Sequence, residues 1–157
     1  MRMAESENES SRTLKLRKMV RKSGPRGVHR EDSKERVETA CSILRLLERT
    51  MQRNAAMFAP NLESSERGMI FYSSTIPRVS LKVFLFKIFK YVNCPRAVFV
   101  HALALMDRLA TGDSQLKLNE YNVHRLFLAA VLVSERHFGV GQNTIKILSV
   151  VAGISTI

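Results

Sequence analysis

The stretch NEYNVHRLFLAAVLVSERHF, from Asn119 to Phe138, decides the fold of this chain. It is polar at both ends and apolar on every side between Leu126 and Val133. A helix that is hydrophobic all round must be enclosed by other elements. The stretch therefore predicts the central helix of a small all-α domain, and an aspartate in place of Ala130 would put an unpaired charge in its core.

Length and composition set the outer bounds. The chain has 157 residues, which suits one domain, and 45% of them are hydrophobic. Its 25 lysines and arginines against 14 aspartates and glutamates give a formal net charge of +11, which favours an acidic partner surface.

Cysteine usage and hydropathy bear on where the protein acts. Cys41 and Cys94 have neither a pairing context nor metal-ligand spacing, and no apolar run is long enough to span a bilayer. We therefore expect a soluble intracellular protein, in the nucleus or the cytoplasm or both, with reduced thiols and no membrane contact.

Residues 1–36 differ from the rest in composition. They are rich in serine, glutamate, lysine and arginine and contain few large apolar residues, which predicts a disordered basic arm. The basic run from Arg12 to Arg26 is interrupted by leucine, methionine and valine. It fits a solvated arm, a nuclear-import signal, a nucleic-acid patch or a short amphipathic helix, and the sequence does not choose among them.

The segment 37–76 is predicted to be an N-terminal helix followed by a linker. Apolar residues recur at steps of three and four along the helix, which indicates one face packed on the domain. They are Val37, Cys41, Leu44, Leu47 and Met51. Pro60 and the serines and glycine that follow it mark the linker.

Four helices can be placed after Pro77. Ser80 can cap the first, which runs through Tyr91. Pro95 opens the second, because the first amide of a helix has no intrahelical partner. The expected apolar stripe of the second helix is Val98, Ala102, Leu105, Met106 and Leu109.

The third helix is the central one, with Asn119 as its expected cap and its end set by Gly139 and Gly141. The fourth is expected from about residue 143 to residue 152. It stops at Gly153, because glycine is common just beyond a helix C-terminus.

Several short segments between Pro77 and Ile154 form a pattern. They are Pro77 with Val79-Ser80, Phe89-Lys90-Tyr91, Cys94, Met106-Asp107-Arg108-Leu109, Leu118, Asn122-Val123-His124-Arg125-Leu126 and Val151-Ala152-Gly153-Ile154. In segment order and spacing this region resembles the cyclin box of P/U-type (phosphate-pathway-like) cyclins. The resemblance implies a cyclin-box-like helical bundle, and it implies structural motif roles for Asn122, His124, Arg125, Arg108 and Gly153.

The family continues past this point with a fifth helix, whereas this sequence stops at Ile157. The expected domain is thus a truncated cyclin box at 77–157, holding four of the five core helices. An apolar face of the central helix should then be exposed, unless the N-terminal helix covers it, and such a face favours partner binding or aggregation.

The resemblance also implies a function. Cyclins of this kind bind a cyclin-dependent protein kinase and hold its regulatory helix in the active position, in control of the cell cycle or of nutrient signalling. Such a kinase needs a lysine–glutamate ion pair before ATP is positioned, and a rigid partner can shift the population toward that state. This is binding, so neither an enzyme activity nor a cofactor is expected.

Three residues are expected to contact the kinase. Arg136 stands where the family more often has lysine; otherwise it is an exposed helix-end cation with Glu135 as a solvated partner. Asp107 stands where the family's second helix carries an aspartate that pairs with a basic residue of the first helix, a position held here by Lys87. The alternative is that Asp107 and Arg108 are surface charges at a helix end.

Other classes of function have less support. The histidines share no metal-ligand spacing, and His124 is expected to be a hydrogen-bonded structural residue. The sequence contains no phosphate loop, nucleophile elbow or other catalytic motif, so no small-molecule substrate is expected. A basic helical nucleic-acid-binding protein of cyclin-like fold remains the alternative. The lysines and arginines of residues 77–157 are, however, scattered over several helices.

Overall fold

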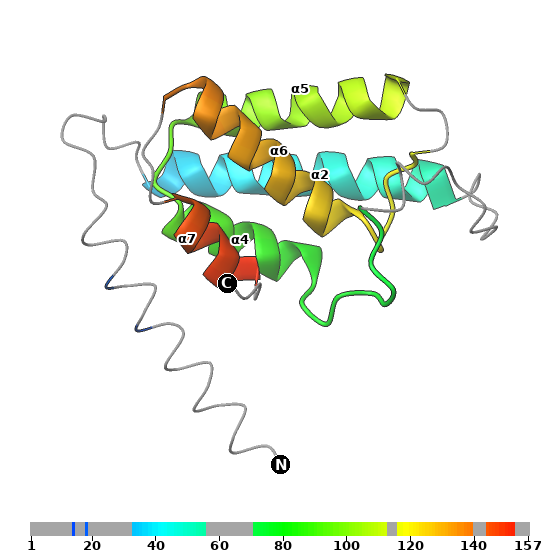
Figure 1. Cartoon of the computed structure of the whole chain (residues 1–157), viewed down its shortest axis with the longest axis horizontal. Helices are drawn as coiled ribbons and strands as arrows, with labels where there is room; N and C mark the ends of the chain where they lie inside the picture. The colour runs from blue at the N-terminus through cyan, green and yellow to red at the C-terminus, as the bar shows by residue number, and fades with distance from the viewer. Residues whose placement is uncertain are drawn as a thin grey trace, which may run out of the picture.

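The computed structural model describes Leu14, Lys18 and the ranges 33–55, 71–112, 116–139 and 144–152. Regular structure in these ranges is helical, with no strand among them. The helices are α2 (Ser33–Ala55), α4 (Leu81–Tyr91), α5 (Arg96–Gly112), α6 (Val123–His137) and α7 (Thr144–Ala152) (Figure 1). The predicted all-α fold is therefore confirmed, and the second half contains the four helices expected of it.

Some expectations fall on residues that the structure does not describe. Leu14 and Lys18 are helical and exposed, but the other residues of the expected basic arm up to residue 32 lie outside the described residues, as do Gly141 and Gly153. Within the described ranges, none of the helices combines the length and the apolar character that a membrane crossing requires.

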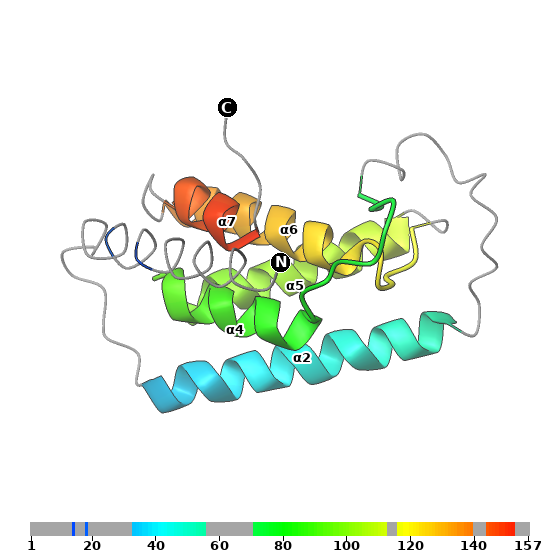
Figure 2. The ribbon, with the colours of Figure 1, turned by 90° about the horizontal axis from the view of Figure 1, so that it is seen from below.

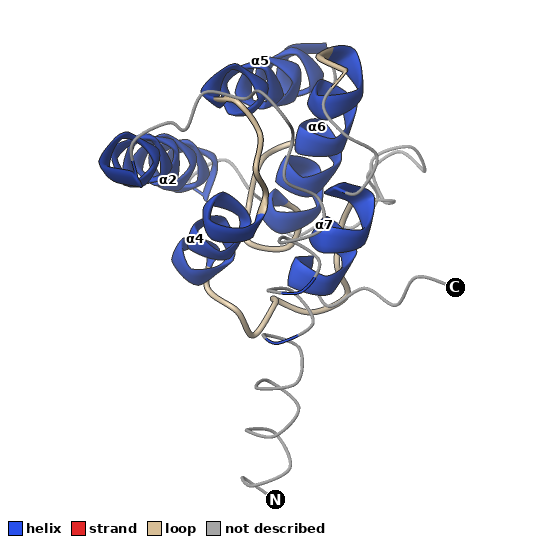
Figure 3. Cartoon of the chain, turned by 90° about the vertical axis from the view of Figure 1, so that its left-hand side faces the viewer, coloured by secondary structure: helices blue, strands red, loops and turns tan. Residues whose placement is uncertain are grey.

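Helix α6 has the central position that its apolar sequence predicts. It packs most extensively on α5 and also contacts α4 and α7 (Figure 3). The helices α5 and α6 run in opposite directions. Helix α4 lies between α2 on one side and α6 with α7 on the other (Figure 2). Helix α2 thus packs mainly on α4, and the extensive helix contacts of the described residues do not include one between α2 and α6.

Aromatic and aliphatic side chains from all five described helices fill the core. Phe99 of α5 and Phe127 of α6 are fully buried, and Phe89 of α4 stacks on Phe99 with ring centroids 3.9 Å apart. Ile88 of α4 and Leu148 of α7 close the same core. Burial of side chains this large is the main source of stability in a domain of this size.

The helix ends follow the signals in the sequence. Ser80 caps α4, its hydroxyl accepting a hydrogen bond from the amide of Val83 at 3.4 Å. Pro95 precedes α5, and its carbonyl accepts from the amide of Val98. Gly139 follows α6 with a φ of +66°, a conformation that glycine adopts without a steric penalty.

Two expectations for the bundle need correction. Helix α6 begins at Val123, because Asn119 opens a turn that ends at Asn122 instead of capping the helix. Leu109 of α5 is 44% exposed and Val133 of α6 is 55% exposed, so neither belongs to the core. The apolar stretch of α6 between Leu126 and Val133 is therefore enclosed on most sides but not on all.

The packed face of α2 differs in part from the expected one. Leu44 and Leu47 are buried as expected, but Val37 is 50% exposed and Ala40 and Ile43 are buried instead. Steps of three and four fit both sets of residues, so the periodicity predicted the helix without fixing which residues face the core.

Helix α2 begins at Ser33, before the boundary expected at residue 36, and Arg36 is one of its most connected residues. The Arg36 guanidinium donates to the carbonyls of Phe89 and Val92 at 2.7 Å each and to that of Cys94 at 3.3 Å. These carbonyls lie where α4 ends and have no helical donor of their own. Arg36 therefore fastens α2 to the junction between α4 and α5.

Candidate functional site

Arg136, the first expected kinase contact, lies exposed in the last turn of α6. Its neighbour Glu135 is only 3% exposed, which corrects the alternative interpretation of Glu135 as a solvated partner. The side chain of Arg136 therefore points to solvent from a turn whose preceding residues, Ser134 and Glu135, are held in the core.

A set of side-chain contacts fixes this end of α6 to the start of α5. The Ser134 hydroxyl donates to the carbonyl of Ala130 at 2.7 Å and lies 3.0 Å from Nδ1 of His101. Because the hydroxyl hydrogen is used, Nδ1 of His101 carries a hydrogen and donates it to Ser134. His101 also stacks on His137 with ring centroids 4.8 Å apart, and Phe138 meets both rings edge-on. Arg136 is thus displayed from a well-anchored helix end.

The outward face of α6 consists of five residues that the core does not bury. They follow one another along the helix at steps of four, three, one and three residues. They are Arg125, Ala129, Leu132, Val133 and Arg136. The face is apolar in the middle and basic at both ends. Its exposure agrees with the packing of α2, which contacts mainly α4 among the described helices.

Lys87 and Asp107, the other expected kinase contacts, lie on different helices. Lys87 is half-buried in α4, and Asp107 is exposed near the end of α5, next to Arg108, which is also exposed. Among the described residues no ion pair joins Lys87 to Asp107. Asp107 lies six residues beyond His101, which is about 9 Å along α5 from the contact with the end of α6.

Asn122, at the start of the family-like motif, organises the turn before α6. It is fully buried, its Oδ1 accepts from the amide of Asn119 at 2.9 Å, and its Nδ2 donates to the carbonyl of Lys117 at 2.9 Å. Both hydrogen bonds close the 116–122 segment on itself. A buried amide that is satisfied in this way specifies one turn geometry, since any other residue would leave backbone groups unpaired.

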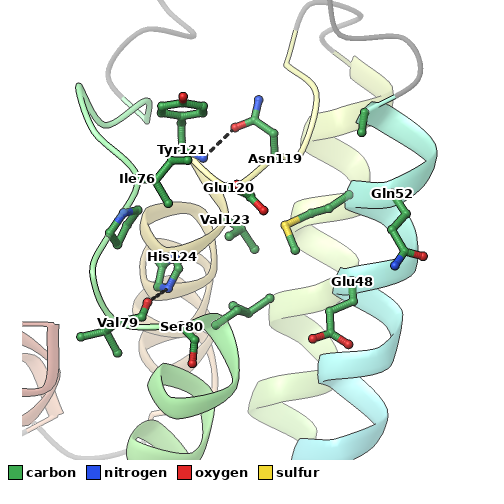
Figure 4. A pocket seen from close by; sticks show the side chains of 14 residues that line it. Glu48, Gln52, Ile76, Val79, Ser80, Asn119, Glu120, Tyr121, Val123 and His124 are labelled. Atoms are coloured by element: carbon green, nitrogen blue, oxygen red, sulfur yellow. Dashed lines mark hydrogen bonds between the residues drawn. The ribbon is translucent and has the colours of Figure 1, made fainter.

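His124 and Arg125 fasten the segment 71–80 to α6. Nε2 of His124 lies 3.0 Å from the carbonyl of Val79, and Nη1 of Arg125 donates to the carbonyl of Tyr72 at 3.0 Å (Figure 4 shows the His124 bond). A carbonyl only accepts, so Nε2 of His124 carries the hydrogen. Burial lowers the pKa of His124 below its ordinary value, against a smaller upward effect of the bond to Val79.

The titratable and thiol side chains of the described residues are dispersed. In the described part of the chain no group of three or more histidine, cysteine, aspartate or glutamate side chains could hold a metal ion. Cys41 is half-buried and Cys94 is buried, and both are free thiols.

Sequence reasoning missed Arg36 and Ser134, the two residues that fix α2 and the end of α6. Arg36 precedes Ala40, Leu44 and Leu47 at helical spacing, and this signal could have placed it on the packed face. Ser134 has no comparable signal, because its partner His101 lies 33 residues away.

Comparison with known proteins agrees with this fold. The model of the family described as Cyclin matches residues 12–156, so the chain belongs to the cyclin family. Cyclins are non-catalytic regulatory subunits.

The similar proteins include plant cyclins of the P and U types. The chain is 33% identical to Cyclin-U4-1 of Arabidopsis thaliana over 92 residues, which cover 59% of this chain and 46% of that protein. It is 34% identical to Cyclin-U4-3 of the same plant over 100 residues, 64% of this chain and 42% of that one. It is 36% identical to Cyclin-P2-1 of Oryza sativa subsp. japonica over 93 residues, 58% and 42% of the two chains.

The chain thus spans less than half the length of these relatives. No solved structure gives a significant match.

Proposed function

We propose that this chain is a regulatory subunit that binds a cyclin-dependent protein kinase. The proposed docking surface lies around Lys87, Asp107 and Arg136, with Arg136 as its principal contact. The observation that carries the proposal is the match to the cyclin family over residues 12–156, together with the exposed cation at the anchored end of α6.

The anchoring of Arg136 suits this role. A partner shifts a kinase toward its active state only by binding that state better than the inactive one, and a rigid surface discriminates between two positions of a helix best. The contacts of Ser134 and His101 keep the last turn of α6 in one place. The planar guanidinium of Arg136 can then donate in parallel to carboxylate or carbonyl oxygens of the kinase.

The middle of the outward face supplies the apolar part of the proposed contact. Leu132 is half-buried and Val133 is largely exposed, one turn before Arg136. An interface with an aliphatic centre and a basic edge excludes water around the charge, which makes loss of that charge costly. Arg136 is therefore expected to contribute more to binding than cations elsewhere on the chain.

The test is an affinity pull-down of the tagged full chain from its native cell extract, with bound kinases identified by mass spectrometry. The variant is Arg136→Glu, and the matched control is Arg45→Glu, which makes the same charge change at an exposed position of α2. Circular dichroism would establish that all three chains have the same helix content.

A cyclin-dependent kinase recovered with the wild type and with Arg45→Glu, but lost with Arg136→Glu, would support both the function and the docking surface. Equal recovery with all three chains would remove Arg136 from the contact while keeping the function. Absence of any such kinase from all three would contradict the proposed function.

A further inference from the structure

Helix α2 carries three arginines on the side that faces away from the core. Arg45, Arg49 and Arg53 are exposed and follow one another at steps of four residues. The buried side chains of this part of α2, Leu44 and Leu47, point the other way. Residues four apart lie on the same side of a helix, about 6 Å apart along its axis. These three residues form the arginine row of α2.

The local structure of α2 does not account for this row. Within the described part of the chain, none of the three arginines takes part in a hydrogen bond or an ion pair. Glu48, the acid between Arg45 and Arg49, lines a pocket between α2, the segment before α4 and the start of α6, and so faces another side of the helix (Figure 4).

The arginine row also has an electrostatic cost. Like charges four residues apart on a helix repel each other, so the row lowers the stability of α2. The helix dipole favours cations only in the last turn, which accounts for Arg53 but not for Arg45 and Arg49. An anion placed over the row would remove this repulsion, and the row therefore suits an anionic partner.

The shape of the row favours carboxylates over a nucleic-acid backbone. A guanidinium binds a carboxylate through two parallel hydrogen bonds. Duplex DNA carries one charge per about 1.7 Å of its axis, so its phosphates would extend beyond a single row and meet Glu38 and Glu48 as well. A short segment with acids about 6 Å apart fits the row better.

The sequence contains one segment of this kind. Glu5, Glu7 and Glu9 alternate with serine and asparagine. In an extended backbone alternate side chains point to the same side and are about 6.6 Å apart, which is close to the step of the arginine row. These glutamates lie outside the described residues, and only their place in the sequence enters the argument.

The connecting chain is long enough to bring the two together. Residues 10–32 join Glu9 to the start of α2, and a chain of that length can span up to roughly 80 Å. The distance along α2 from Ser33 to Arg53 is about 30 Å. Because both groups belong to one chain, they meet at a high effective concentration, which compensates for the weakness of exposed ion pairs.

We propose that the segment 5–9 docks on the arginine row of α2, with its three glutamates paired to Arg45, Arg49 and Arg53. The docked segment covers the outward side of α2 and keeps the row from other anionic partners until it is displaced. The contact lies on a different helix from Arg136 and does not depend on kinase binding.

The test is nuclear magnetic resonance on the full ¹⁵N-labelled chain with a nitroxide on the α-amino group of Met1, which broadens the amide signals that lie near it. The first variant combines Glu5→Gln, Glu7→Gln and Glu9→Gln. The second combines Arg45→Gln, Arg49→Gln and Arg53→Gln. The matched control combines Glu31→Gln and Asp32→Asn, which removes acids from the same arm without touching the segment 5–9.

A further variant tests the spacing of the acids. Ser6→Glu combined with Asn8→Ser and Glu9→Asn keeps the composition of the segment 5–9 but makes its three acids consecutive. Consecutive acids in an extended backbone point to both sides, so they cannot all face one row.

Broadening in the wild type is expected to be strong for the amides of residues 45–53 and weak for those of residues 33–37. It should disappear in both glutamine variants, decrease in the spacing variant, persist in the control, and disappear at about 1 M salt, where the Debye length is about 3 Å. No broadening in the wild type, or equal broadening in the first variant, would overturn the proposal.

A second measurement distinguishes the chain's own segment from that of another copy. The nitroxide-labelled chain without ¹⁵N is mixed with the ¹⁵N-labelled chain without nitroxide. We expect no broadening in this mixture, because the segment 5–9 reaches the row of its own chain. Broadening of residues 45–53 in the mixture would overturn the proposal in favour of a second copy as the source of the segment. No kinase takes part, so failure here leaves the proposed function untouched.

Discussion

The two ends of α6 differ in charge and in how they are fixed. At its C-terminal end Arg136 is exposed, and side-chain contacts with α5 through His101 and Ser134 hold the last turn. At its N-terminal end α6 borders a pocket lined by Glu48 and Glu120. His124 and Arg125 hold this end of the helix through hydrogen bonds to carbonyls of the segment 71–80. The same helix thus carries an exposed arginine at one end and borders an acidic pocket at the other. The comparison shows that a net charge of +11 does not describe the surfaces of this chain.

The largest effect is expected from Ala130→Asp, which should unfold the domain, so that neither end of α6 keeps its structure. Ala130 is buried in the middle of α6, and an aspartate there would be an unpaired charge in the core. We expect a loss of more than about 4 kcal/mol in the free energy of unfolding, with loss of helical circular dichroism at 25 °C. The control Ala104→Asp, at an exposed position of α5, should cost less than about 1 kcal/mol. Similar stability of the two variants would show that α6 is not the centre of the fold.

A smaller effect on the free energy of unfolding is expected from Arg36→Ala, which should loosen the attachment of α2 to α4. The variant leaves three carbonyls at the end of α4 without their donor, and we expect a loss of about 2 kcal/mol in urea unfolding. Kinase recovery in the pull-down should persist, because Arg36 contacts the end of α4 and not the last turn of α6. The control Arg45→Ala should change stability by no more than about 0.5 kcal/mol. Loss of kinase recovery in Arg36→Ala would mean that the last turn of α6 depends on how α2 packs.

The smallest effect concerns pH and the N-terminal end. The pKa of His124 is lowered in the folded state, so the unfolded chain binds a proton more readily than the folded one. The stability that neutral His124 contributes is complete above pH 6.5 and is lost as pH falls through the lowered pKa. The fall in stability between pH 7.5 and pH 5, measured by urea unfolding, should be smaller in His124→Gln than in the wild type. An identical fall in the two chains would contradict this assignment.

Local signals in the sequence predicted much of the fold. Ser80, Pro95 and Gly139 set helix ends through chemistry within one turn, and the structure has those ends. The apolar run of α6 predicted its central place in the bundle, since a helix that is apolar on most sides must be enclosed by other elements. The family-like segments at 77–154 predicted the cyclin family, which the match over residues 12–156 confirms.

Other features depended on contacts between residues far apart in the chain. Asn119 and Asn122 are both good helix caps, and only the closed turn with Lys117 decided that α6 begins at Val123. A step of three or four is compatible with two adjacent faces of α2, and only the packing on α4 decided that Ala40 and Ile43 are buried while Val37 is exposed.

The sequence by itself thus determined the helices, their approximate ends, the family and the position of Arg136 at the end of the central helix. Only the tertiary structure decided that Glu135 is buried beside it, that Leu109 and Val133 face solvent, and that Glu48 and Glu120 line the same pocket. The physical reason is the range of the interactions. Caps and periodicity act within a few residues, whereas burial and the pairing of distant charges depend on which helices become neighbours.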